Sequence, residues 1–226
     1  MNVTIISNDK RYEYLNERLI DLGYNSKIAN INDTVETDIL ILSVRKEYTD
    51  NEYSELLLKS KYKAILSPKY IKNSLDYTEN EDFLKKNAYL TAEGTIALYY
   101  NEVKETLLNK NVLVLGYGRI GKYLSKMLKS LNCEVSVYAR RKEIQNEIVL
   151  DGYKSAELKN ENYDIVFNTV PTTIVKNEFE GCKCIELANG FFYKENVING
   201  NGIPGKMFPK TASKIIFDAI LPYLSI

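Results

Sequence analysis

The chain has 226 residues, 45% of them hydrophobic, which is enough for a substantial core and for division into two compact domains. Its 30 basic residues balance 30 acidic ones, so no excess positive charge points to nucleic acid or to an anionic membrane surface. The absence of histidine excludes a His–Asp pair and a histidine-bound metal, which leaves lysine, carboxylate, tyrosine or water to carry any proton transfer.

The three cysteines form an odd number, and Cys182-Lys-Cys184 lacks the spacing and partner ligands of a zinc site. We therefore expect reduced thiols in a cytoplasmic protein, and no metal. The first residues, Met1 to Ser7, indicate a strand and not a charged leader, and no apolar run is long enough to span a bilayer.

The first 86 residues alternate between strand and helix patterns, which is typical of a parallel sheet covered on both faces. Strands are predicted at 2–7, 38–44 and 63–66, and helices at 9–22 and 51–60. Because this segment has no phosphate-loop glycines, we interpret residues 1–86 as an N-terminal α/β lobe that faces the substrate or a partner.

A long helix is predicted at 91–108, inside a linking segment that we place at 87–110. Glu93 would then lie in the first helical turn, where a carboxylate gains from the helix dipole. This position makes Glu93 a candidate for proton transfer, with simple helix electrostatics as the alternative role.

The most informative motif begins where the apolar run Val112 to Leu115 meets three spaced glycines. An apolar strand, a glycine turn and an amphipathic helix in this order are typical of a dinucleotide-binding βαβ unit. Gly116 allows the turn, Gly118 lets the backbone approach a pyrophosphate, and Gly121 lets the helix pack closely on the strand. The expected cofactor contacts here are Gly116, Tyr117, Gly118, Arg119, Ile120 and Gly121.

The residues after the next predicted strand, 133–138, indicate which dinucleotide is bound. NAD sites usually have an acid about 20 residues past the glycines, to hold the ribose 2′-hydroxyl. Arg140 and Arg141 stand here instead, and guanidinium groups can pair with a 2′-phosphate. The sequence thus predicts NADP and not NAD, with a solvated basic turn as the alternative.

Further strands at 164–168 and 183–187 complete a predicted NADP-binding Rossmann domain at 111–210. Ligands of such sheets bind outside the carboxyl ends of the strands. The residues that end or follow these two strands are therefore expected cofactor contacts, although asparagine, threonine and proline also form ordinary turns. They are Asn168, Thr169, Val170, Pro171 and Asn189.

The segment 199–205 is rich in asparagine and glycine and predicts a loop. Lys206 and Lys210 flank Met-Phe-Pro just after it, and a rigid loop there could hold cationic groups against a carboxylated ligand. Ordinary solvation of both lysines is the alternative. The last segment, 211–226, predicts a helix that packs at the junction of the two lobes.

These motifs, in this order and spacing, resemble the family of dipicolinate synthase A subunits. The resemblance runs from about residue 87 to 220 and depends most on Ala92-Glu93-Gly94-Thr95-Ile96 and on Gly202-Ile203-Pro204-Gly205-Lys206 with Pro209-Lys210-Thr211-Ala212. It implies an α/β fold of two Rossmann-like lobes with parallel sheets, in the two-domain architecture of the hydroxyacid dehydrogenases, with a cleft between the lobes.

The resemblance also implies an activity. It is the oxidation, with NADP, of a dihydrodipicolinate-level intermediate of lysine biosynthesis to pyridine-2,6-dicarboxylate, in the mother-cell cytoplasm of a sporulating bacterium. On this hypothesis Glu93 moves a proton, while Lys206 and, secondarily, Lys210 hold a carboxylate of the dicarboxylate substrate. The family works with a flavoprotein-like partner, the dipicolinate synthase B subunit, and a homo-oligomer is left open.

Two departures from the family concern the substrate side of the cleft. The chain is shorter than the family, mainly in its first lobe, and Asn189-Gly-Phe-Phe replaces the expected Ser-x-Pro-Gly-Gly. Two alternative functions remain at this point. One is another NADP-dependent dehydrogenase or reductase of a small carboxylated substrate, and the other is a non-catalytic nucleotide-sensing role.

Overall fold

The computed structural model describes residues 1–159, 162–171, 179, 181–188 and 195–224. The chain divides into two compact units. Unit 1 comprises Met1–Asn87 with Phe208–Ile226, and unit 2 comprises Ala88–Met207. The C-terminal segment, which the sequence analysis places at a lobe junction, is therefore part of unit 1.

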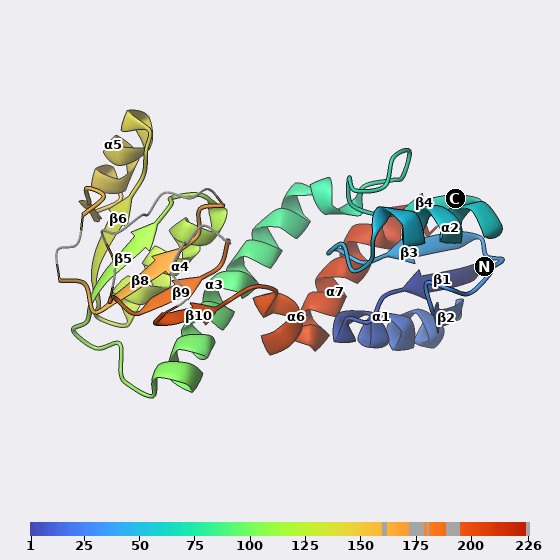
Figure 1. Ribbon diagram of the computed structural model, residues 1–226, viewed down its shortest axis with the longest axis horizontal. Coiled ribbons are helices and arrows are strands. Elements are labelled where there is room, and N and C mark those ends of the chain that lie inside the picture. The colour runs from blue at the N-terminus through green and yellow to red at the C-terminus, as the bar shows by residue number, and fades with distance from the viewer. Residues whose placement is uncertain (160–161, 172–178, 180, 189–194, 225–226) are drawn as a thin grey trace. The chain divides into compact units, whose positions relative to one another are not determined.

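Unit 1 is built on a parallel sheet with the strand order β2-β1-β3-β4 (Figure 1). The strands are β1 (Asn2–Ile6), β2 (Asn25–Ala29), β3 (Ile39–Leu42) and β4 (Ala64–Leu66). The central strands β1 and β3 are the apolar runs that the sequence predicts, and both are almost wholly buried. The edge strand β2 is missed, because Ser26 is its only buried residue and it offers no apolar run.

Two helices of unit 1 confirm the prediction to within one residue at each end, α1 (Lys10–Asp21) and α2 (Asp50–Lys59). Side-chain caps explain this accuracy, since the Asp9 carboxylate accepts the Arg11 N–H and Thr49 forms a capping box with Glu52. The C-terminal helix α7 (Pro209–Ile220) packs against α1 inside the same unit.

The long helix is α3 (Glu81–Val103), so the predicted range 91–108 is wrong at both ends. Asn80 caps its start by accepting the N–H groups of Asp82 and Phe83, and Lys104, with a φ of 60°, follows its end. Glu93 is consequently not in the first turn. It lies exposed in the middle of α3, where the helix-dipole argument does not apply.

Unit 2 contains a parallel sheet with the strand order β10-β9-β8-β5-β6-β7 (Figure 1). Its strands are β5 (Asn111–Leu115), β6 (Glu134–Tyr138), β7 (Lys154–Ser155), β8 (Ile165–Asn168), β9 (Cys184–Glu186) and β10 (Val197–Asn199). This is the Rossmann order, in which the chain winds outward in both directions from β5. The predicted α/β class with two Rossmann-like parallel sheets is thereby confirmed, although the short edge strands β7 and β10 are missed.

Two helices connect strands of this sheet: α4 (Arg119–Ser130) follows β5, and α5 (Lys142–Leu150) follows β6. Val112 and Val114 of β5 are fully buried together with Leu124 and Leu128 of α4 and Phe167 of β8. Burial of one side chain of this size stabilises a fold by about 1.5–3 kcal/mol. The glycine turn between β5 and α4 therefore rests on a tightly packed core.

The chain after β10 also differs from the prediction. Residues 203–205, which the sequence predicts as the end of a loop at 199–205, are helical and begin α6 (Ile203–Met207). Gly202, with a φ of 73°, makes the turn that precedes α6, and Pro204 is tolerated because the first turn needs no N–H donor there.

Among the described residues no three cysteine, aspartate or glutamate side chains are placed to hold a metal ion. No helix in the same part of the chain is both long enough and apolar enough to cross a bilayer. Cys133, Cys182 and Cys184 take part in no disulfide among the residues that the structure describes.

Candidate dinucleotide-binding site

The turn after β5 requires its first glycine. Gly116 has a φ of 100°, and its N–H donates to the Tyr138 carbonyl at 2.9 Å, which ties the turn to the end of β6. A Cβ on Gly116 would lie 2.5 Å from Thr169 Oγ1 and 2.8 Å from Val170 Cγ2. Both the backbone conformation and the close approach of residues 169–170 therefore favour glycine.

Gly121 and Gly118 differ in what surrounds them. A Cβ on Gly121 would lie 2.1 Å from the Gly116 carbonyl oxygen, because α4 begins directly against the turn. A Cβ on Gly118 would have no atom within 4 Å, so the protein leaves open space there. Gly118 also gives α4 no side-chain cap, and the first N–H groups of α4 are therefore suited to phosphate oxygens.

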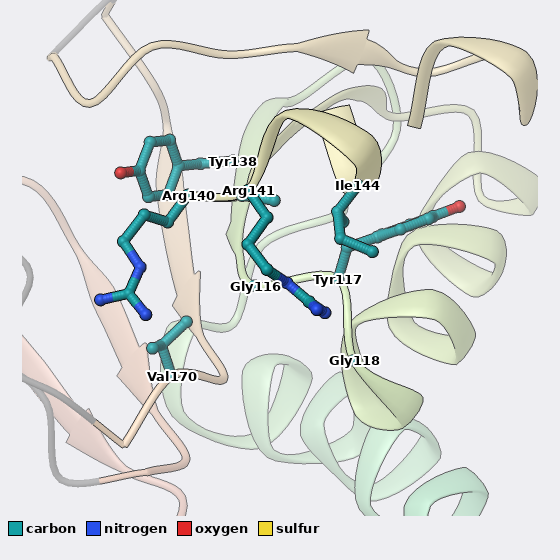
Figure 2. A pocket seen from close by; sticks show the side chains of 9 residues that line it. Gly116, Tyr117, Gly118, Tyr138, Arg140, Arg141, Ile144 and Val170 are labelled. Atoms are coloured by element: carbon teal, nitrogen blue, oxygen red, sulfur yellow. The ribbon is translucent and has the colours of Figure 1, made fainter. Parts of the chain in front are cut away.

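A pocket of about 310 Å³ lies at this turn (Figure 2). Its lining residues come from the glycine turn, the end of β6, the start of α5 and the loop after β8. They are Gly116, Tyr117, Gly118, Tyr138, Ala139, Arg140, Arg141, Ile144 and Val170. The predicted contacts at residues 116–118, 140–141 and 170 thus line one pocket.

The two arginines point into this pocket from the β6–α5 turn. Figure 2 shows the Arg140 side chain directed toward Val170 and the Arg141 side chain directed toward Gly118. Both are exposed, and no ion pair joins either guanidinium to a described carboxylate. Two cations with no counter-ion among the described residues, beside a glycine turn, fit an anionic ligand that brings a further phosphate.

Tyr117 lines the pocket, and its side chain also makes contacts with Asp151 and Tyr153. Its hydroxyl donates to Asp151 Oδ2 at 2.6 Å, and its ring packs edge-on against Tyr153. Burial and the Asp151 carboxylate raise the pKa of Tyr117, so the phenol stays protonated and keeps donating. The side chain therefore anchors the glycine turn to the end of α5.

Arg119 and Ile120 are the first two residues of α4, which places their N–H groups in the uncapped turn described above. Thr169 fixes the next loop, because its hydroxyl and its N–H both donate to the Leu115 carbonyl, at 2.8 and 2.9 Å. Pro171 follows as an exposed residue. The predicted contact Asn189 lies outside the described residues.

Asn168 ends β8 and pairs with Glu186, which ends β9 in the same register. Asn168 Nδ2 donates to both carboxylate oxygens of Glu186, at 3.1 and 2.9 Å. The Asn168 side chain faces this carboxylate and the Val170 peptide, so it shapes the pocket wall from behind. The sequence predicts that this strand end, 186–190, lies near the cofactor, with Asn189 as the contact. The pairing of Glu186 with Asn168 follows only from the register of β8 with β9.

The three predicted catalytic residues do not line this pocket. Glu93, on α3, and Lys206, on α6, are exposed residues of unit 2. Lys210 belongs to unit 1, in the first turn of α7, where it borders a hollow of about 370 Å³ with Arg18 and Ser213. Their catalytic roles stay predictions.

Unit 1 has a charged hollow of about 400 Å³ at the carboxyl ends of β1 and β3. The Glu47 carboxylate accepts the Ser7 hydroxyl at 2.6 Å and the Asn8 N–H at 2.7 Å. Arg45 and Lys46 also line the hollow. The sequence predicts that loops of this lobe face the substrate. The charged residues that line this hollow lie in the loops that follow β1 and β3.

Comparison with known proteins agrees with this geometry. Residues 82–179 match the family model of the D-isomer specific 2-hydroxyacid dehydrogenase, NAD binding domain. The matched range contains the glycine turn, both arginines and the loop after β8. The match supports a nicotinamide dinucleotide as the class of cofactor that this domain binds. It also supports an oxidoreductase as the class of protein.

A curated relative gives a more specific match. Over 166 residues the chain is 28% identical to the dipicolinate synthase A subunit of Bacillus subtilis (strain 168). The chain is similar to dipicolinate synthase A subunits. The match covers 65% of this chain and 56% of the relative, so it spans little more than half of that protein's length. The resemblance predicted from the motifs is confirmed.

Two solved structures share the fold over the whole chain. The dipicolinate synthase A subunit from Bacillus halodurans has a TM-score of 0.81 at 20% identity, with 100% of this chain and 98% of that chain covered. The corresponding chain of dipicolinate synthase from Bacillus subtilis has a TM-score of 0.77 at 22% identity, with 100% and 96% covered. The fold similarity thus extends beyond the region of detectable sequence similarity.

Proposed function

We propose that the chain is an NADP-dependent oxidoreductase that converts a dihydrodipicolinate-level intermediate to pyridine-2,6-dicarboxylate during endospore formation. The observation that carries the choice of NADP is the pair Arg140 and Arg141, whose guanidinium groups enter the pocket without described carboxylate partners. The choice of reaction is supported by the similarity to the dipicolinate synthase A subunit.

The residues of the pocket fit the proposed cofactor in three places. The uncapped start of α4 would hold the pyrophosphate, next to the open space at Gly118. Arg140 and Arg141 would hold the 2′-phosphate, where an acid would repel it. Thr169 and Val170 would border the ribose and nicotinamide half. When bound, oxidised NADP supplies a nicotinamide C4 that accepts a hydride.

The proposed reaction needs no strong base. The dihydropyridine ring loses a hydride to the nicotinamide and a proton to solvent or a side chain, and the product ring becomes aromatic. Aromatisation supplies the driving force, which suits a chain without histidine. If the substrate is the hydroxylated tetrahydro form, water must also leave, and Glu93 is the residue we propose to move that proton.

The partner in this proposal is a second, flavoprotein-like protein, and the reaction is tested with and without it. Absorbance of the aromatic product and of reduced nicotinamide is followed together, with this chain alone and with the coexpressed pair. Equal rates of both signals support the proposal. Nicotinamide reduction without the aromatic product indicates another dehydrogenase, and activity that survives changes to the glycine turn indicates a sensing role.

Lys206→Ala is expected to raise the substrate KM by about tenfold, because a charge-assisted contact to a carboxylate is lost. Binding of NADP should change by less than about twofold, since Lys206 does not line the dinucleotide pocket. Steady-state kinetics and a separate NADP titration check both values, with the exposed Lys126→Ala as control. An unchanged KM removes Lys206 from the substrate site.

Glu93→Gln is expected to lower kcat by about a hundredfold if Glu93 transfers the proton, which is the usual size of general acid–base catalysis. Glu102→Gln is the matched control, because Glu102 is another exposed carboxylate on α3. Kinetics at saturating NADP measure both variants. If the Glu93→Gln and Glu102→Gln enzymes have the same kcat, Glu93 does not transfer the proton and is only a surface residue of α3.

A further inference from the structure

Glu186 is the one buried carboxylate among the described residues, with 6% of its surface exposed. It ends β9 opposite Asn168, which ends β8 and is 1% exposed. Burial of a carboxylate is costly unless donors surround it. The hydrogen-bond partners of Glu186 therefore indicate the role of this buried carboxylate.

Two donors to Glu186 within the described part of the chain come from different strand ends. Asn168 Nδ2 lies 3.1 Å from Oε1 and 2.9 Å from Oε2, and the Ala188 N–H lies 2.6 Å from Oε1. The carboxylate thus joins the end of β8 to the residues just after β9. Both ends lie at the edge of the sheet where a Rossmann fold binds its ligand.

The carboxylate also sets the orientation of the Asn168 amide. An ionised carboxylate can only accept, so the amide must present its NH₂ group to Glu186 and its oxygen to the other side. That oxygen accepts the Val170 N–H at 3.0 Å, while Nδ2 also lies 3.2 Å from the Val170 carbonyl. The Val170 peptide is held on both its N–H and its carbonyl sides.

Val170 is a wall of the dinucleotide pocket, and its Cγ2 would lie 2.8 Å from a Cβ on Gly116. A shift of the Val170 peptide therefore changes the space over the glycine turn. We propose that Glu186 is a positioning residue for dinucleotide binding, which acts by fixing the Asn168 amide and, through it, the pocket wall at Val170. This inference depends on the proposed function, because it assumes that the pocket takes a dinucleotide.

Glu186→Gln replaces the carboxylate with an amide of nearly the same shape. It therefore tests the pattern of donors and acceptors between residues 186 and 168. The oxygen of the new amide must remain on the Ala188 N–H, so its NH₂ group replaces Oε2 and meets the Asn168 NH₂ group as a second donor. Asn168 then either keeps only its 3.1 Å contact to the amide oxygen beside this second donor, or rotates, which places a donor against the Val170 N–H. An unsatisfied buried donor of this kind should weaken binding of the dinucleotide by about tenfold.

In the double variant Glu186→Gln, Asn168→Asp, the amide and the carboxylate exchange positions. The hydrogen bonds between the two side chains should then be restored. The glutamine NH₂ group then donates to the aspartate, whose other oxygen still accepts the Val170 N–H. The Kd for the dinucleotide is expected to return to within about threefold of the wild-type value. Asn168→Asp alone should bind less well than either, because it buries two carboxylates together.

The experiment titrates the full-length wild-type chain and the three variants with NADP and with NAD by calorimetry. Glu134→Gln, an exposed carboxylate change in the same unit, is the control and should keep the wild-type Kd. The 15N NMR signal of the Val170 N–H is recorded without ligand. It should shift in Glu186→Gln and return in the double variant.

A merely structural Glu186 would lower the stability of the variants and leave the Kd of the folded fraction unchanged, which would overturn the proposal. A double variant that binds no better than Glu186→Gln would overturn it as well. Failure of the proposed function is recognised separately, because the wild-type chain would then bind neither dinucleotide.

Discussion

Replacing Gly121 with alanine is expected to destabilise unit 2 by at least about 3 kcal/mol, the upper part of the range for overpacked sites. The new Cβ would lie 2.1 Å from the Gly116 carbonyl oxygen, which is backbone and cannot rotate away. Either α4 must move off β5 or the turn must open. Both changes also remove the N–H groups of α4 from the phosphate site, so binding of NADP should be lost. Urea unfolding and calorimetric titration measure the two effects.

Gly118→Ala is the matched control for this prediction. Its φ of −79° and ψ of −167° suit alanine, and a Cβ there meets no protein atom within 4 Å. The free energy of unfolding should therefore stay within about 1 kcal/mol of the wild-type value. Binding of NADP should still weaken by about tenfold or more, because the methyl group takes space that the pyrophosphate needs. If Gly121→Ala were as stable as Gly118→Ala, the described packing of α4 against the turn would be wrong.

The double variant Arg140→Ala, Arg141→Ala is expected to bind NADP about a hundredfold less tightly, while its affinity for NAD changes little. In the proposed binding mode each guanidinium would donate charge-assisted hydrogen bonds to the 2′-phosphate. Loss of one such partner costs about 1.5–3 kcal/mol, or roughly tenfold or more in Kd. NAD lacks that phosphate, so the variant should lose the preference between the two dinucleotides. Each single variant should lose about half of the effect in free energy.

Lys126→Ala controls for the loss of a positive charge, because Lys126 is exposed on α4 and does not line the pocket. Its affinity for NADP should stay within about twofold of the wild-type value at moderate salt. Equal losses of NADP and NAD affinity in the arginine variant would show that the guanidinium groups hold the pyrophosphate and not a 2′-phosphate. The choice of NADP would then be wrong.

The sequence predicted best where local chemistry determines the structure. The apolar run before Gly116 and the cap residues Asp9 and Thr49 fix elements that the structure reproduces. The strand β2 could not be recognised, because its place depends on hydrogen bonds to β1 and not on its own side chains. The start of α3 was predicted at residue 91, whereas Asn80 is the residue that accepts its first N–H groups.

The candidate site divides in the same way. The glycine turn and Arg140 with Arg141 are each contiguous in the sequence, and the sequence predicted both as parts of one cofactor site. The Asn168–Glu186 pair joins residues that are distant in the chain, and only the register of β8 with β9 brings them together. The same holds for Tyr117 and Asp151, whose contact depends on how α5 ends.

A crystal structure of the full-length chain with bound NADP tests the central claim most directly. The account predicts the pyrophosphate over the turn from Gly116 to Gly121 and the 2′-phosphate within hydrogen-bonding distance of Arg140 or Arg141. Density for the dinucleotide at another place, or an empty glycine turn at a saturating concentration of NADP, would contradict it.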